Sequence, residues 1–369
     1  MIAFNDLKAS QASIAHEIAA AALRVLACGR FILGPEVDAF EVEFAAWHQR
    51  EFAVGVASGT DAIELALRAA GIGPGDEVIT VSHTAVPTVC AIERCGARPV
   101  LVDIEPATYT ISVEAAANAI TSRTAAIVPV HLYGHPADMP RILELAAAHD
   151  LLIVEDCAQA HGARLNGKLA GTFGHLAAFS FYPTKNLGGC GDGGAILTND
   201  RQWAERVKRI RSYGQASRYQ HAERGVNSRL DELQAAILRV KLAHLGEQVA
   251  QRRDLAHRYS ASLRTVLPPI EDSTTYEIEH AYHLYVIRDR FRDSLKARLE
   301  AAGIETQIHY PVPVHLQPAY ADLGHQVGSL PVTEHVCREI LSLPLYPGLS
   351  LADVDAVSQA IDRSCREAA

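Results

Sequence analysis

Between residues 52 and 198, short apolar runs alternate with longer amphipathic segments, and this alternation limits the possible folds more than any other feature. The short runs are predicted as strands at 52–57, 78–81, 99–102, 125–130, 151–154, 177–181 and 195–198. Helices are predicted between them at 62–70, 85–95, 113–119 and 139–149. Repeated units of this kind predict a mostly parallel sheet with helices on both faces, in which ligands bind at the carboxyl ends of the strands.

The flanking segments predict helices before the sheet and a smaller unit after it. The expected helices are 14–28, 35–47, 201–211 and a long one at 229–263, while the polar segment 212–227 is interpreted as a loop. Beyond the long helix we expect strands at 283–287 and 306–310 and helices at 294–302, 333–341 and 352–363. We therefore place a large domain at 1–245 and a small C-terminal domain at 246–369.

The composition argues against several classes of function. A net charge of −9 and aromatic content of 6% suit neither a nucleic-acid nor an anionic-membrane surface. The N-terminus has no signal-peptide pattern, and no apolar run is long enough for a membrane span. The seven cysteines are scattered without a C-x-x-C pair, and the 17 histidines show no metal-ligand spacing. We expect a cytoplasmic protein that holds no metal.

Lys185 follows a predicted buried strand that must stop at Tyr182–Pro183. A lysine at such a strand end can be partly desolvated, which lowers its pKa and makes its amine nucleophilic. A solvated loop lysine is the plainer interpretation of this residue taken alone.

Two other strand ends carry polar residues that match such a lysine. Ser58-Gly59-Thr60 precedes a helix, where free N–H groups suit a phosphate, although a plain helix cap has the same pattern. Asp156 is the last residue of an apolar strand, where its carboxylate is either a partner of a cofactor or part of a cap or salt bridge. Glu155, the residue before it, should face the other side of the sheet. A lysine, an acid and a phosphate cup together are what pyridoxal 5′-phosphate (PLP) requires.

The glycine run after Lys185 offers a competing interpretation. Gly189–Gly194 matches G-x-G-x-x-G, the fingerprint of a dinucleotide-binding oxidoreductase. That fingerprint must open a helix, whereas a predicted strand, 195–198, follows here. The glycines instead suit backbone that passes close to the lysine.

Several motifs together resemble the DegT/DnrJ/StrS family of sugar aminotransferases, PLP enzymes of the aspartate-aminotransferase fold (fold type I). The resemblance spans nearly the whole chain and rests on GPEVDAFEVEFA (34–45), ASGTDAIELAL (57–67), EDCAQAHGA (155–163), FSFYPTKNLG (179–188), GDGGA (191–195) and NSRLDELQAA (227–236). It implies a large α/β domain, with a mostly parallel seven-stranded sheet between helices, and a small α+β C-terminal domain.

The resemblance also implies roles for individual residues. Lys185 corresponds to the Schiff-base lysine, and Asp156 to the partner of the pyridine nitrogen. The other cofactor contacts it implies are Gln159 near the ring hydroxyl, His83 stacked on the ring in place of the commoner Phe or Trp, a phosphate cup of Gly59, Thr60 and Ser180, and Asn227 reaching the phosphate from the neighbouring subunit. Asn227 therefore implies a homodimer with shared active sites. Substrate contacts are expected from Tyr182, His309 and Tyr310, although His309 and Tyr310 suit the core of the small domain equally well.

A finer resemblance points to one branch of this family. The segments SHTAVPTV (82–89), HLYGHPADM (131–139), NSRLDELQAAIL (227–238) and IHYPVPVHLQPAY (308–320) are similar to enzymes that aminate C-3 of nucleotide-linked 3-oxo-6-deoxyhexoses. The implied reaction takes the amino group of L-glutamate, gives 2-oxoglutarate and a dTDP-3-amino-3,6-dideoxyhexose for O-antigen, S-layer or antibiotic sugars, and passes through pyridoxamine 5′-phosphate.

Alternatives to this reaction are amination at C-4 of a 4-keto nucleotide sugar and a non-catalytic regulatory role. Dehydratase relatives carry histidine in place of the lysine, so Lys185 argues against that branch.

Overall fold

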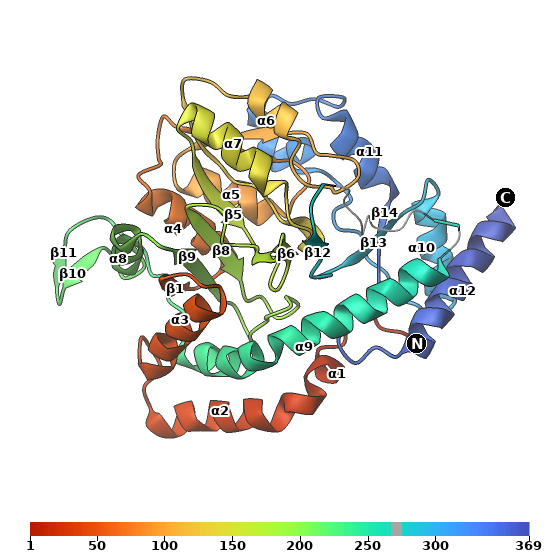
Figure 1. Cartoon of the computed structure of the whole chain (residues 1–369), viewed down its shortest axis with the longest axis horizontal. Helices are drawn as coiled ribbons and strands as arrows, with labels where there is room; N and C mark the ends of the chain where they lie inside the picture. Colours follow the sequence, from red (N-terminus) through yellow and green to blue (C-terminus); the bar gives the residue numbers. More distant parts are fainter. Residues whose placement is uncertain (264, 267–274, 369) are drawn as a thin grey trace.

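The computed structural model describes residues 1–263, 265–266 and 275–368, the last four by their backbone only. A seven-stranded sheet forms its centre, in the order β1-β9-β8-β5-β4-β2-β3 (Figure 1). The strands are β1 (Phe52–Val56), β2 (Glu77–Val81), β3 (Arg98–Val102), β4 (Thr124–Ile127), β5 (Leu152–Asp156), β8 (Leu176–Ser180) and β9 (Gly194–Thr198). Of these seven strands, β9 runs in the opposite direction to the other six, which confirms the predicted, mostly parallel sheet.

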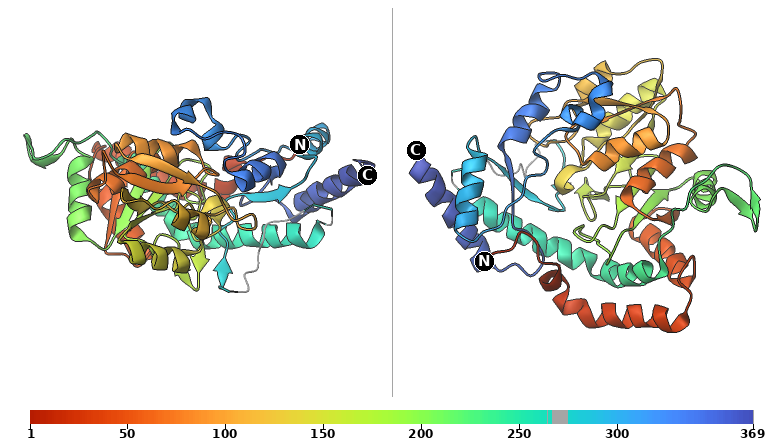
Figure 2. Two further views of the ribbon diagram at one scale, coloured as in Figure 1. Left: turned by 90° about the horizontal axis from the view of Figure 1, so that it is seen from above. Right: turned by 180° about the vertical axis from the view of Figure 1, so that it is seen from behind.

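Helices cover both faces of this sheet. One face packs against α4 (Gly59–Ala69), α5 (Val86–Arg94) and α8 (Arg201–Ile210). The other face packs against α3 (Pro35–Trp47), α6 (Val113–Asn118), α7 (Met139–His149) and the first part of α9 (Glu232–Ser262). α2 (Ala15–Cys28) lies outside, along α9 (Figures 1 and 2).

The long helix α9 continues from the sheet into a second apolar cluster. Its last turns pack there with β13 (Tyr285–Arg288), β14 (Ile340–Leu343), α10 (Arg292–Ala301) and α12 (Leu351–Ala368). The predicted boundary between 245 and 246 falls inside α9, and the division into two domains stays a prediction. Among the described helices, none is long and apolar enough to cross a membrane.

The remaining elements are short. α1 (Leu7–Gln11) and the 3₁₀ turn Ala12–Ile14 lead into α2, and 3₁₀ turns occur at Leu132–Gly134, Val314–Leu316 and Pro318–Leu323. Strands β6 (Arg164–Leu165), β7 (Lys168–Leu169) and β12 (Ile278–Glu279) form a small sheet of their own.

Three segments differ from the sequence predictions. The predicted loop 212–227 contains a hairpin, β10 (Gln215–Ser217) and β11 (Gln220–His221), which projects from the body of the protein (Figures 1 and 2). The predicted strand at 306–310 is wrong, because only Gln307 pairs, in a single bridge to Ser342. The predicted helix 333–341 is α11 (Pro331–Glu339), which ends two residues early because Ile340 and Leu341 pair with β13.

Candidate active site

A cavity of about 440 Å³ opens at the carboxyl ends of the parallel strands. This is the edge where α/β sheets bind ligands. Nine of the residues predicted for the site line this cavity: Gly59, Thr60, Asp156, Gln159, Ser180, Tyr182, Lys185, His309 and Tyr310. Segments far apart in the sequence thus meet at one place, although the structure by itself assigns none of them a role.

Lys185 lies on the connection between β8 and β9, just past Pro183. Its backbone N–H donates a hydrogen bond of 2.9 Å to the carbonyl of Tyr182, which shapes the turn after the strand. Burial lowers the pKa of the Lys185 amine to about 8, against a smaller opposite effect of Asp156. Among the described residues that line the cavity, Lys185 is the only lysine or arginine.

Asp156 is the last residue of β5, and hydrogen bonds hold both of its carboxylate oxygens. Oδ1 accepts from the N–H of Ala158 at 3.1 Å, and Oδ2 accepts from the hydroxyl of Thr88 at 2.8 Å. Burial raises the pKa of Asp156, while these hydrogen bonds and the charge of Lys185 act to lower it. Each carboxylate oxygen has a second lone pair, so the carboxylate can still accept a hydrogen bond from a protonated ring nitrogen.

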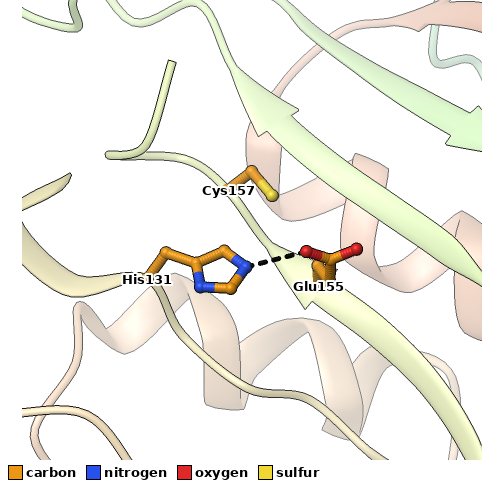
Figure 3. Close-up of side chains that lie close together, drawn as sticks. All are labelled: His131, Glu155 and Cys157. Carbon is orange, nitrogen blue, oxygen red and sulfur yellow. Dashed lines mark hydrogen bonds and ion pairs between the residues drawn. The ribbon is translucent and has the colours of Figure 1, made fainter. Parts of the chain in front are cut away.

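Glu155, the preceding residue, faces the opposite side of the sheet, as the alternation of strand side chains predicts. It accepts a hydrogen bond of 2.9 Å from His131 (Figure 3). It accepts others of 2.6–2.8 Å from the N–H groups of Gly171, Phe173 and Gly174. Burial raises the pKa of Glu155, but the hydrogen bonds outweigh it, and the net direction is downward.

The group His131, Glu155 and Cys157 has the composition of a metal site, with its possible ligand atoms within 4.8 Å of one another. Nδ1 of His131 accepts from the N–H of Ala137 at 3.0 Å, so its Nε2 carries the proton given to Glu155. Both ring nitrogens and both carboxylate oxygens are therefore already used. Burial also raises the pKa of the Cys157 thiol well above its ordinary value, so the geometry describes a structural cluster.

The first turn of α4 lies at the cavity and is shaped to approach a bound group closely. Ser58 caps the helix, its Oγ accepting from the N–H of Asp61 at 3.1 Å. A Cβ on Gly59 would lie 2.6 Å from Cβ of Ser180, so only glycine fits there. The first N–H groups of an α-helix have no partner within it, and they favour a phosphate.

Gln159 is fixed at the cavity wall by two contacts. Its Oε1 accepts from the N–H of Tyr133 at 2.7 Å, and its Nε2 donates to the hydroxyl of Tyr310 at 3.2 Å. Tyr133 has a φ of 59°, which is uncommon for a residue other than glycine, and its hydroxyl donates to the carbonyl of His309. Tyr133 thus links Gln159 and His309, two residues of the cavity lining, and it was not among the predicted site residues.

His83 lies outside the lining of the cavity in this structure, and its predicted stacking on a cofactor ring stays a prediction. It is buried outside the cavity lining, with Nε2 2.8 Å from the hydroxyl of Tyr133 and Nδ1 3.4 Å from Sγ of Cys337. Thr84 and Ala85 line the cavity instead. The regular alternation of side chains ends with β2 at Val81, so the spacing beyond it no longer fixes which residue faces the site.

Asn227 is exposed and lies outside the cavity lining of its own chain. This position is compatible with the predicted contact to a second subunit, which stays a prediction.

The chemistry of the cavity fits PLP. It offers a half-buried amine with a lowered pKa, a buried carboxylate with spare acceptor positions and a tightly packed helix N-terminus. These correspond to the aldehyde, the ring nitrogen and the phosphate of that cofactor.

Comparisons with known proteins agree with this chemistry. Residues 12–362 match the model of the DegT/DnrJ/EryC1/StrS aminotransferase family. The chain is 49% identical to a dTDP-3-amino-3,4,6-trideoxy-alpha-D-glucose transaminase of Streptomyces venezuelae, over 98% of this chain and 97% of that protein. It is 45% identical to a dTDP-3-amino-3,6-dideoxy-alpha-D-galactopyranose transaminase of Aneurinibacillus thermoaerophilus, over 98% of this chain and 99% of that protein.

Solved structures give the same result. The crystal structure of DesV from S. venezuelae superposes with a TM-score of 0.96 at 48% identity, covering 99% of this chain and 98% of that one. The structure of NtdA from Bacillus subtilis, which has bound pyridoxamine phosphate, superposes with a TM-score of 0.91 at 30% identity, covering 99% of this chain and 85% of that one.

Proposed function

Because the chain belongs to the DegT/DnrJ/EryC1/StrS aminotransferase family and is a PLP-dependent transaminase, we propose that it transfers the amino group of L-glutamate to C-3 of a dTDP-linked 3-oxo-6-deoxyhexose. The observation that carries the proposal is the cavity itself, where Lys185, Asp156 and the first turn of α4 come together. The choice of C-3 and of dTDP is supported by the two curated relatives, both of which are named for dTDP-3-amino sugars.

In this proposal the residues at the centre of the cavity bind the cofactor and move protons. The bound cofactor supplies a carbon that links to amines and a ring that accepts electrons from the substrate. The amine of Lys185 holds the cofactor at rest and, once free, moves a proton at the substrate carbon. Asp156 holds a proton on the ring nitrogen, and the N–H groups of Gly59 and Thr60 bind the phosphate.

The cavity walls supply the remaining tasks. The pKa of about 8 leaves part of the Lys185 amine neutral near neutral pH, as a base requires. Gln159 and Ser180 hold the edges of the ring and its phosphate, and Tyr182, His309 and Tyr310 contact the sugar or nucleotide. Their place in the cavity lining supports these roles.

The proposal extends to the assembly and setting of the enzyme. The protein is a homodimer of the cytoplasm, in which Asn227 of each subunit faces the other subunit's cavity. Its exposed side chain, outside its own cavity, supports that arrangement. The large domain comprises 1–245 and the small domain 246–369, and the product serves O-antigen, S-layer or antibiotic sugars.

The first experiment tests the covalent role of Lys185. The purified protein mixed with PLP should develop a visible absorption band from the lysine-bound cofactor. Lys185→Ala should lack the band, whereas Lys168→Ala, at an exposed lysine of β7, should keep it. A wild-type protein that binds no PLP would disprove the proposal.

The second experiment tests the position of amination. The wild-type enzyme is given L-glutamate and dTDP-3-oxo-6-deoxyhexoses of both C-4 configurations, and the products are assigned by NMR and mass spectrometry. Nitrogen at C-3 is the expected result. Turnover of only a 4-keto nucleotide sugar would replace the proposal by its C-4 alternative.

A further inference from the structure

Two threonines connect Asp156 to the first turn of α5. The hydroxyl of Thr88 donates to Oδ2 of Asp156 at 2.8 Å, and the hydroxyl oxygens of Thr88 and Thr84 are also 2.8 Å apart. All three side chains are buried, with exposed fractions of 2% for Thr88, 3% for Thr84 and 4% for Asp156. Both threonines also line the cavity.

The direction of this chain follows from counting protons. A hydroxyl has one hydrogen to donate, and an ionised carboxylate can only accept. If Thr88 donates to Asp156, its oxygen must accept from Thr84. The chain therefore runs from Thr84 to Thr88 to Asp156 and matches a carboxylate that carries a negative charge.

We propose that Thr88, supported by Thr84, is a positioning residue that orients the Asp156 carboxylate toward the cofactor ring and keeps it ionised. This inference rests on the proposed function, because it assumes that Asp156 meets the ring nitrogen. Hydrogen bonds to a charged group are stronger than those between neutral groups, and in a buried site they offset part of the cost of removing the charge from water.

Other groups also act on this carboxylate and must be held constant in a test. The titratable residues that interact electrostatically with Asp156 are Lys185 and Tyr310, which line the cavity, and His131 and Cys157, which lie with Glu155. All of them remain in place when a threonine is changed, so a comparison between variants isolates the hydroxyl.

The test measures the dissociation constant of pyridoxamine phosphate against pH by calorimetry, with the full-length protein. This form of the cofactor has no aldehyde to react with Lys185, so its affinity reports the non-covalent contacts. Binding weakens in acid as Asp156 becomes protonated. Thr88→Val keeps the shape but loses the donor, so the carboxylate takes up its proton more readily and the acid limb moves to higher pH by about one unit.

Matched variants separate positioning from general damage. Thr88→Ser should restore the wild-type profile, and Thr84→Val, which acts through Thr88, should give a smaller shift in the same direction. Thr80→Val is the control, because it removes the buried hydroxyl of a threonine in β2 that donates to the carbonyl of Val128 at 2.8 Å. It should leave the pH profile of pyridoxamine phosphate binding unchanged. Thermal unfolding of each variant confirms that it is folded, and if Thr88→Val does not fold, Thr84→Val decides.

The outcomes distinguish this inference from the proposed function. A wild-type protein that fails to bind pyridoxamine phosphate overturns the proposed function. A wild-type protein that binds it, with profiles for Thr88→Val and Thr84→Val that superpose on its own, overturns the positioning role alone.

Discussion

Glu155 and Asp156 are neighbouring carboxylates on one strand, and both are buried, but their surroundings differ. The hydrogen bonds of Glu155 come from His131 and from the backbone of one loop, and they fill both of its oxygens. Asp156 accepts two hydrogen bonds from the described part of the chain, one on each oxygen, and faces a cavity. Burial raises the pKa of both acids; the hydrogen bonds of Glu155 outweigh this effect and its pKa is lowered, whereas those of Asp156 do not and its pKa is raised. An acid whose hydrogen bonds are complete stabilises the fold, whereas an acid that keeps free acceptor positions can meet a ligand.

The largest effect is expected from removing the charge that faces the cavity. Asp156→Asn keeps the shape but cannot hold a proton on the ring nitrogen, so turnover should fall by about 10³-fold. The free energy of unfolding should change by less than about 1 kcal/mol, because a buried charge with few partners is itself costly. Steady-state kinetics and chemical denaturation measure the two quantities. Turnover near that of the wild type would show that Asp156 is another structural acid.

Glu155→Gln should have the opposite profile. Its amide group would face backbone N–H donors in a buried place, so the free energy of unfolding should fall by about 3 kcal/mol. Turnover of the folded protein should stay within a factor of a few.

The pH dependence of stability sharpens the same test. The pKa of Glu155 in the folded protein lies below its ordinary 4.5, so its contribution is present above pH 4.5 and is lost as the pH falls below that value. The difference in unfolding free energy between wild type and Glu155→Gln should therefore shrink in acid. A difference that stays constant down to strongly acidic pH would contradict this assignment.

The smallest expected effect concerns the amine across the cavity. Asp156 raises the pKa of Lys185 against the larger effect of burial, which gives about 8. In Asp156→Asn the midpoint for capture of PLP should move to lower pH, by up to about one unit, and in Glu155→Gln it should stay in place. The rate of formation of the visible band against pH measures this midpoint. An equal shift in both variants would mean that the cavity does not distinguish the two acids.

The sequence predicted the part of the contrast between Glu155 and Asp156 that follows from strand geometry. Alternation of side chains along a strand is enough to place Glu155 and Asp156 on opposite faces, and the repeated strand-helix units predict the sheet that carries them. The prediction for His83 came from the family resemblance, and strand geometry could not test it, because the chain leaves the regular strand at Val81 and turns before α5 begins. The segment 306–310 resembled a strand, but it borders the cavity and pairs only at Gln307.

Contacts between residues far apart in the chain could not be predicted from the sequence. Thr88 looks like an ordinary residue in the first turn of a helix, and its partner Asp156 lies 68 positions away. Tyr133 lies in the segment 131–139 that carries part of the resemblance, but its contact with Gln159 was not predicted, since it depends on a left-handed backbone that turns its N–H toward Gln159. A pair of threonines four positions apart at a helix start is a pattern that could direct attention to such a site in other chains.

The connection 181–193 that carries Lys185 joins β8 and β9, antiparallel neighbours whose ends pair Ser180 with Gly194. Closing such a local loop costs little chain entropy, whereas bringing Thr88 beside Asp156 requires a contact across a long stretch of chain. We therefore expect the lysine segment to become ordered early during folding and the Thr88–Asp156 contact late, which pulse-labelled hydrogen exchange of β8 and α5 would reveal. We then expect PLP to bind only at the end of folding, because the segment of Lys185 becomes ordered before the Thr88–Asp156 contact completes the cavity.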